Sequence, residues 1–260
     1  MPNWIQNSLG QTGYPAVQSK HGLGVHELPL TWWLIAPLGF FCLRYAVART
    51  EHRFTGLESW FLGELGIVEN LTVAFLLLAL ISTLAVLRLY GRHMHIVPRI
   101  FLAIYCLGCL YFAGEEASWG QHWFGWETGE YFQAVNDQRE TNLHNTSVWF
   151  DRLPKGIVSL WIFVGGIVVP LCFYCKSLKI DSSKPGWWLC PTWACLPTAI
   201  FATIATWPSK IERYTGWNFY FDEAQEIKEL YIAYFILLYI VSLALRLQKM
   251  QQSGERYSPL

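Results

Sequence analysis

Long apolar runs separated by short polar stretches set the predicted architecture of this chain. An α-helix needs about 20 mostly apolar residues to cross the hydrocarbon core of a bilayer. Six segments approach that length, and they cover residues 28–47, 68–90, 97–116, 156–175, 187–207 and 229–247. The pattern therefore predicts an all-α fold, a polytopic membrane helical bundle of about six transmembrane helices. Pro191 and Pro197 lie inside the fifth segment and predict a kink or an irregular turn there.

The domain organisation follows from the same pattern. Residues 1–27 form a polar N-terminal segment, residues 28–247 a single transmembrane domain, and residues 248–260 a polar C-terminal tail. An ordered loop of roughly 40 residues follows the third segment, and loops of this length in compact domains are usually functional. We find no internal repeat and no linker to a second domain.

Composition agrees with a membrane protein and argues against nucleic acid as a partner. The 260 residues are 53% hydrophobic and only 15% charged, against about 25% charged in an average soluble domain. Aromatic residues make up 17%, including 14 tryptophans, as expected for aromatic belts at the two membrane interfaces. The formal net charge is zero, so no basic field favours nucleic acid. The lipid bilayer is the predicted partner.

The charges also predict an orientation and an acidic face. Lys and Arg residues divide almost evenly between the two sides, but they are densest in the short second and fourth loops. Short loops decide orientation, so we expect both termini in the cytoplasm, as in a protein of the bacterial inner membrane. Of 19 acidic residues, only Glu27, Asp181 and Glu255 fall on that side. The outer face, built by the first, third and fifth loops, is therefore chemically specialised.

The third loop carries the strongest candidate chemistry. Glu115 and Glu116 end an apolar run, where ionisable groups are costly and mark functional sites. If the helix continues through Gln121, Glu115 and His122 share one face. Glu140 and His144 are four residues apart, which would also place both on one helical face. Glu and His at such spacings bind divalent metals such as zinc, although an ordinary solvated pair is the alternative for Glu140 and His144.

Two further groups of acids belong to the same predicted face. Asp222, Glu223 and Glu226 precede the last apolar segment. They are either additional metal ligands or acids that favour the positive end of a helix dipole. Glu69 begins the second segment and is either a further ligand or a capping acid. The predicted metal ligands are therefore Glu115, His122, Glu140, His144 and Glu226, with Glu115 and Glu116 as catalytic candidates and Glu69, Asp222 and Glu223 behind them.

Several known site types are missing from the sequence. It contains no HExxH zinc motif, no phosphate-binding loop, no GxSxG nucleophile motif and no dinucleotide fingerprint. Membrane desaturases need about eight histidines on one face, and this face has three.

The third-loop motifs carry a resemblance to known proteins. GEEASWGQ and ETNLHN together resemble a group of uncharacterised bacterial polytopic membrane proteins, a resemblance that implies the fold and no activity. A weaker similarity is to the alkaline ceramidase-like and progestin-receptor-like membrane hydrolases, which combine acids near helix ends with zinc-binding histidines. This chain differs from them in lacking a C-terminal histidine pair and in having six predicted segments where they have seven.

Three functions fit these observations. The first is a metal-dependent membrane enzyme, a hydrolase in class, acting on a lipid or another amphiphile at the outer face. The second is a non-enzymatic membrane subunit or assembly factor that docks a membrane protein partner through its aromatic, acidic face. The third is an ion-coupled transporter that uses Glu69, Glu115 and Glu116 as proton or cation sites.

Overall fold

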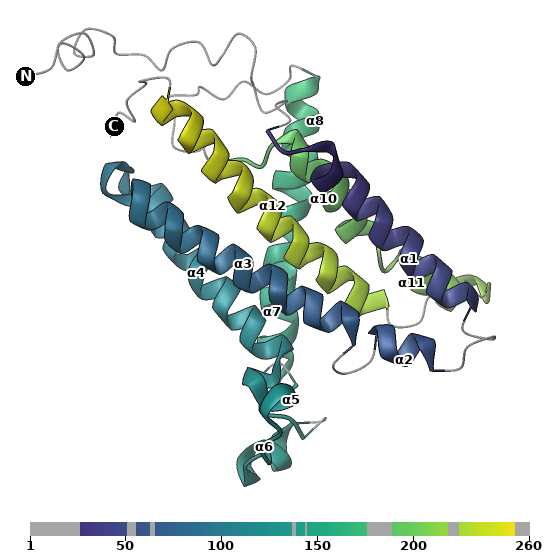
Figure 1. The fold of residues 1–260 in the computed structure, drawn as a ribbon. Helices are drawn as coiled ribbons and strands as arrows, with labels where there is room; N and C mark the ends of the chain where they lie inside the picture. The colour runs from purple at the N-terminus through teal and green to yellow at the C-terminus, as the bar shows by residue number, and fades with distance from the viewer. Residues whose placement is uncertain are drawn as a thin grey trace, which may run out of the picture.

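The computed structural model describes residues 27–50, 56–62, 66–136, 139–143, 145–175, 189–217 and 224–252, and every regular element in these ranges is a helix (Figure 1). Five stretches are long and apolar enough to cross a membrane: Thr31–Thr50, Trp60–Tyr90 (of which residues 63–65 lie outside the described part), Ile96–Glu116, Trp149–Cys172 and Ala224–Lys249. They coincide with five of the six predicted segments. The chain is thus a polytopic, all-helical membrane protein.

Helix α12 (Ala224–Gln252) is the centre of the bundle. In the most apolar part of α12, 78% of the residues are buried, whereas the corresponding parts of the other four stretches are 17–33% buried. Helix α12 packs against α3 (Ile67–Tyr90), α7 (Val148–Phe163) and α10 (Leu196–Ile204), and α4 (Ile96–Glu116) packs against α3 and also reaches α12 through Tyr105. Figure 1 shows α12 running between α3 on one side and α10 on the other. The remaining helices therefore turn more of their surface to lipid.

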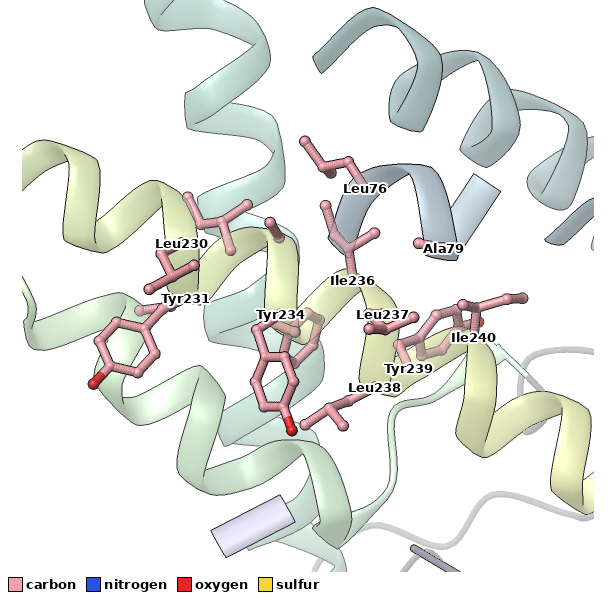
Figure 2. Packing of buried hydrophobic residues seen from close by; sticks show 14 of the residues in the cluster. Leu76, Ala79, Leu230, Tyr231, Tyr234, Ile236, Leu237, Leu238, Tyr239 and Ile240 are labelled. Atoms are coloured by element: carbon pink, nitrogen blue, oxygen red, sulfur yellow. The ribbon is translucent and has the colours of Figure 1, made fainter. Parts of the chain in front are cut away.

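Tyrosines on α12 donate hydrogen bonds to backbone carbonyls around the start of the first membrane helix. The hydroxyl of Tyr234 donates to the carbonyl of Trp32 at 2.7 Å, and that of Tyr231 donates to the carbonyl of Pro37 at 2.9 Å. These acceptors belong to the π-helical turn η2 (Thr31–Ile35) and to the start of α1 (Ala36–Thr50). In Figure 2 both hydroxyls point away from Leu76 and Ala79 of α3. Tyrosine hydroxyls thus replace the water that hydrocarbon lacks.

The fifth predicted segment is not a long helix within the residues described. It consists of the short turn η6 (Trp193–Cys195) and of α10, which has only nine residues. Thr192 is extended, with φ −92° and ψ 175°, directly after Pro191, and Pro197 occupies the first turn of α10. Prolines are tolerated there because the amides of a first helical turn have no partner in the helix. The predicted irregularity is present, and it shortens the helix.

Gly166 allows α7's continuation to approach α10 and α12 closely. It lies in the π-helical segment η5 (Val164–Val168), which leads into α8 (Val169–Tyr174). A Cβ atom at Gly166 would lie 2.7 Å from Ala199 Cβ and 2.7 Å from a ring carbon of Phe235. Both neighbours are fully buried. The contact therefore requires glycine for space.

We predict that Gly166→Ala destabilises the folded protein, by about 1–3 kcal/mol of overpacking. A fluorescence-based thermal unfolding curve of the detergent-purified protein would show a lower Tm. Gly156→Ala is the matched control, because Gly156 lies in α7, which leads directly into η5, and a Cβ there meets nothing within 4 Å. Equal Tm values for the two variants would contradict this account of the packing.

Candidate functional site

A left-handed turn follows α4 and fixes the geometry of the candidate site. The helix ends at Glu116, and Ser118, Trp119 and Gly120 have φ values of 42°, 56° and 100°. Left-handed backbone costs about 1–3 kcal/mol for a residue other than glycine. The turn places the Trp119 indole against Gly114, where a Cβ would lie 3.0 Å from the ring. The expected continuous helix through Gln121 is therefore wrong, and with it the helical face shared by Glu115 and His122.

Glu115 joins the two sequence motifs through both of its carboxylate oxygens. Oε1 accepts a hydrogen bond from the indole Nε1 of Trp119 at 2.8 Å. Oε2 accepts one from the backbone amide of Leu143 at 2.7 Å, 28 residues further along the chain. The side chain is 2% exposed. A buried carboxylate is stabilised by such charge-assisted bonds, so Glu115 holds the second motif against the end of α4.

Glu140 belongs to the same cluster. Its Oε2 accepts hydrogen bonds from Ser118 Oγ at 2.8 Å and from Asn142 Nδ2 at 2.7 Å, while Asn142 Nδ2 also lies 3.0 Å from Ser118 Oγ. Asn136 Nδ2 donates to Asn142 Oδ1 at 2.7 Å. Ser118, Asn136 and Asn142 are all buried. We call Glu115, Ser118, Asn136, Glu140 and Asn142 the two-motif network.

Gln121 extends these bonds to the outer part of the loop. Its Oε1 accepts from the backbone amide of Thr141 at 2.7 Å, and its Nε2 donates to Thr128 Oγ1 at 2.7 Å. Gln133 donates to the carbonyl of Thr128. Polar side chains therefore hold together the segment between α4 and α7, which includes α5 (Gln121–Phe124) and α6 (Glu130–Val135). We call residues 117–147 the head, and Figure 1 shows α5 and α6 beyond the ends of α3 and α4.

The second motif is not a helix. Residues 139–143 have no helical assignment, and Arg139 is left-handed with φ 58°. The expectation that Glu140 and His144 share a helical face is therefore wrong. The carboxylate of Glu140 turns inward instead, because Ser118 and Asn142 supply its hydrogen-bond donors.

Glu116 faces a different cluster, centred on Lys155 of α7. The Lys155 ammonium lies 2.8 Å from Asp151 Oδ1 and 2.8 Å from Glu229 Oε1 of α12. Glu116, Lys155 and Glu229 line a cavity of about 20 Å³, which is room for one water molecule. Glu69, at the start of α3, and Glu226 lie within electrostatic range of Glu116. Acids of α3 and α12 therefore lie near Glu116 of α4. Glu115 is not part of this group.

The predicted metal ligands are only partly brought together. Glu115 and Glu140 each bond across the two motifs, through Leu143 and Ser118 respectively, whereas Glu226 lies in the first turn of α12, as an acid placed for the helix dipole does. His144, Asp222 and Glu223 lie outside the described residues, as does the side chain of His122. Among the described side chains, no three His, Cys, Asp or Glu residues form a group that could hold a metal ion.

Sequence reasoning overlooked the partners of the acids. Ser118, Gln121 and Asn142 stand inside the two quoted motifs. Ser118 and Asn142 bond Glu140 and each other, and Gln121 accepts from the amide of Thr141. Lys155 stands in a loop by hydropathy, and only the fold shows that it neutralises acids from two other helices. The sequence could have indicated Ser118 as a partner of these acids, because a small polar residue beside buried acids has few roles other than hydrogen bonding.

The outside of the head exposes large aromatic side chains. Phe124 and Tyr131 are 78% and 70% exposed, and Trp123 and Trp126 are also exposed. Phe124 and Trp126 stack with their ring centroids 6.0 Å apart. We call Trp123, Phe124, Trp126 and Tyr131 the aromatic patch. Glu127 and Glu130, which are exposed beside it, make this part of the head acidic.

The fold and the head define a class, a polytopic membrane protein with a hydrogen-bonded, aromatic head at one end of its bundle. Comparison with protein-family models, with curated proteins and with solved structures finds no match. No activity, cofactor or partner is therefore carried over to this chain from another protein.

We predict that Asn142→Ala loosens the head, because Ser118 Oγ and Glu140 Oε2 each lose one donor and Asn136 Nδ2 loses one acceptor. Each such group costs about 1–3 kcal/mol. Trypsin should then cleave the detergent-purified protein after the exposed Arg139 at least about ten times faster, since about 1.4 kcal/mol corresponds to tenfold in an opening equilibrium. Glu127→Ala, a change at an exposed acid of the same head, should leave the rate unchanged. Similar cleavage of both variants would show that the network does not hold the head.

Proposed function

We propose that this protein is a membrane-embedded subunit or assembly factor that docks a protein partner through the aromatic patch of its head. The observation that carries the proposal is that the acids of the two motifs hydrogen-bond other groups of the same chain. Both oxygens of Glu115 and one oxygen of Glu140 accept hydrogen bonds from the chain itself. These acids therefore make a rigid support for the exposed rings.

A rigid aromatic surface is suited to binding protein. Large exposed apolar patches mark interaction sites, and Trp and Tyr dominate the residues that carry most of the binding free energy in interfaces. A support held in place before binding lowers the entropy lost on association. Glu127 and Glu130 are exposed beside the rings, and negative charge disfavours an anionic membrane surface as the ligand. The complementary partner is a protein with a basic, apolar surface.

A sixth crossing, added to the five long apolar helices, would place the head on one defined side of the membrane. We infer that residues 189–205 make a fifth crossing antiparallel to α12. Thr192 contacts Ser242 near the end of α12, whereas Phe201 stacks on Tyr231 near its beginning, with ring centroids 5.3 Å apart. With this crossing, the described chain begins at Glu27 and ends at Gln252 on the side opposite the head, which we assign to the cytoplasm.

Photo-crosslinking in native membranes tests the docking proposal. We expect benzoylphenylalanine in place of Tyr131 to give a discrete adduct with one protein. Phe124→Ala should reduce that adduct at least about fivefold, because a central aromatic residue contributes more than about 1 kcal/mol.

Leu107→Ala is the control, because Leu107 is 67% exposed on α4 within the membrane-spanning part of the helix. It should leave the adduct unchanged. If lipid alone is crosslinked at position 131, or if both alanine variants behave alike, the docking proposal is wrong.

A second candidate function is the metal-dependent membrane hydrolase acting on a lipid. The observation that favours it is that Glu115 and Glu140 each hydrogen-bond across the two motifs, while His122 directly follows the first motif and His144 lies in the second. A divalent metal such as zinc would then be held by Glu140, His144 and their neighbours, with Glu116 or Glu115 left as a base. The docking proposal needs no metal.

Elemental analysis of the detergent-purified protein separates the two functions. The hydrolase requires stoichiometric metal in the wild type and its loss in His144→Ala and in Glu140→Gln. His95→Ala should retain metal, because His95 caps the opposite end of α4. The docking proposal predicts no stoichiometric metal in any of the four proteins, so metal that disappears only with His144 and Glu140 would overturn it.

A further inference from the structure

An apolar cavity lies between α1, α10, α12 and the short helix α11 (Trp207–Thr215). Its volume is about 190 Å³, and its lining includes Phe41, Phe201, Trp207, Ile211, Ile227 and Tyr231. A cavity of about 150 Å³ lined by such side chains stays free of water and takes up apolar molecules. This cavity is therefore large enough for part of a hydrocarbon chain.

The cavity lies beside a helix suited to the membrane interface. Trp207, Ile211 and Tyr214 recur at helical spacing along α11 and are 54%, 42% and 87% exposed. The stripe makes α11 amphipathic, as in helices that lie in the plane of an interface. Because Trp207 and Ile211 both line the cavity and reach the surface, the cavity adjoins lipid.

Positive charge accumulates at the same place. Lys210 and Arg213 are exposed on α11, and Arg49 is exposed at the end of α1, 5.7 Å from the ring centroid of Tyr45. Arg44, which also lines the cavity, is 1% exposed. Glu212 is the only acid within helices α1 and α11. A ligand with an apolar tail and a negative headgroup matches this distribution.

We propose that the cavity binds one acyl chain of an acidic glycerophospholipid, whose phosphate headgroup lies beside Arg49, Lys210 and Arg213. The chain enters between Phe41 of α1 and Trp207 of α11, both of which are exposed. Each buried methylene contributes about 0.8 kcal/mol, and each basic side chain near an anionic lipid about 1 kcal/mol. The site holds lipid at the joint between α11 and the bundle.

Photolabelling of the full-length protein in lipid nanodiscs tests this site. The discs contain equal amounts of phosphatidylglycerol and phosphatidylcholine, with a diazirine-acyl probe of either lipid. We expect the phosphatidylglycerol probe to label α1, α10 and α11 residues around the cavity more strongly than the phosphatidylcholine probe does. Ala205→Phe fills the cavity and should reduce this labelling about tenfold, because excluding two methylenes has that effect.

Two further variants make the outcome decisive. Ala103→Phe adds the same ring on the exposed side of α4 and should leave labelling unchanged. Lys210→Glu/Arg213→Glu changes only exposed side chains and should reduce phosphatidylglycerol labelling to the phosphatidylcholine level. Labelling that maps elsewhere, that survives Ala205→Phe, or that keeps its headgroup preference in the charge-reversal variant would overturn the proposal. If Ala205→Phe does not fold, the label map and the charge-reversal variant decide the question. The result is independent of docking, because the aromatic patch is on other helices.

Discussion

Inside a bilayer no water is available to hydrogen-bond polar groups, and this constraint shapes every part of the protein. Its effect is clearest around α12, the most buried helix. Tyr231 and Tyr234 donate to carbonyls in and beside the π-helical turn before α1, and Tyr105 donates to the carbonyl of Ile236 within α12. Thr192 and Ser242 both hydrogen-bond the carboxylate of Glu27. Backbone carbonyls and one oxygen of the Glu27 carboxylate thus receive hydrogen bonds from side chains of other segments.

The same constraint explains the head. Glu115 and Glu140 would be costly as free carboxylates at low exposure, so the chain surrounds them with indole, amide and hydroxyl donors. Meeting those donors requires a reversal of the chain directly after α4, which the left-handed Ser118 and Trp119 provide at a cost in backbone strain. The gain is a fixed platform, from which Phe124 and Tyr131 point outward. If the head docks a partner as proposed, function and stability depend on the same bonds, and a change in the network would affect both.

Adjacent residues in one motif serve separate sites. Glu115 turns toward the head and bonds Trp119 and Leu143, whereas Glu116 turns toward Lys155 and Glu229 between the helices. The Lys155 cluster joins α4, α7 and α12 near the base of the head. Disturbing either acid would alter how the head is held on the bundle, because Glu115 bonds within the head and Glu116 faces the helices of the bundle. The two acids are adjacent in the sequence at the point where the head joins the helix bundle.

The sequence by itself determined the class of fold and the location of its polar chemistry. Hydropathy is a local property, so the membrane helices and the acidic ends of the third and sixth segments could be read from it directly. Only the tertiary structure decided what the acids contact. The direction of Glu115 depends on where α4 stops, and its partner Leu143 is 28 residues away. Likewise, the prolines of the fifth segment predicted an irregularity, but its packing along α12 showed how a nine-residue helix still fits the bundle. Long-range hydrogen bonds leave no periodic trace in a sequence, because any polar residue at the right place in space can supply them.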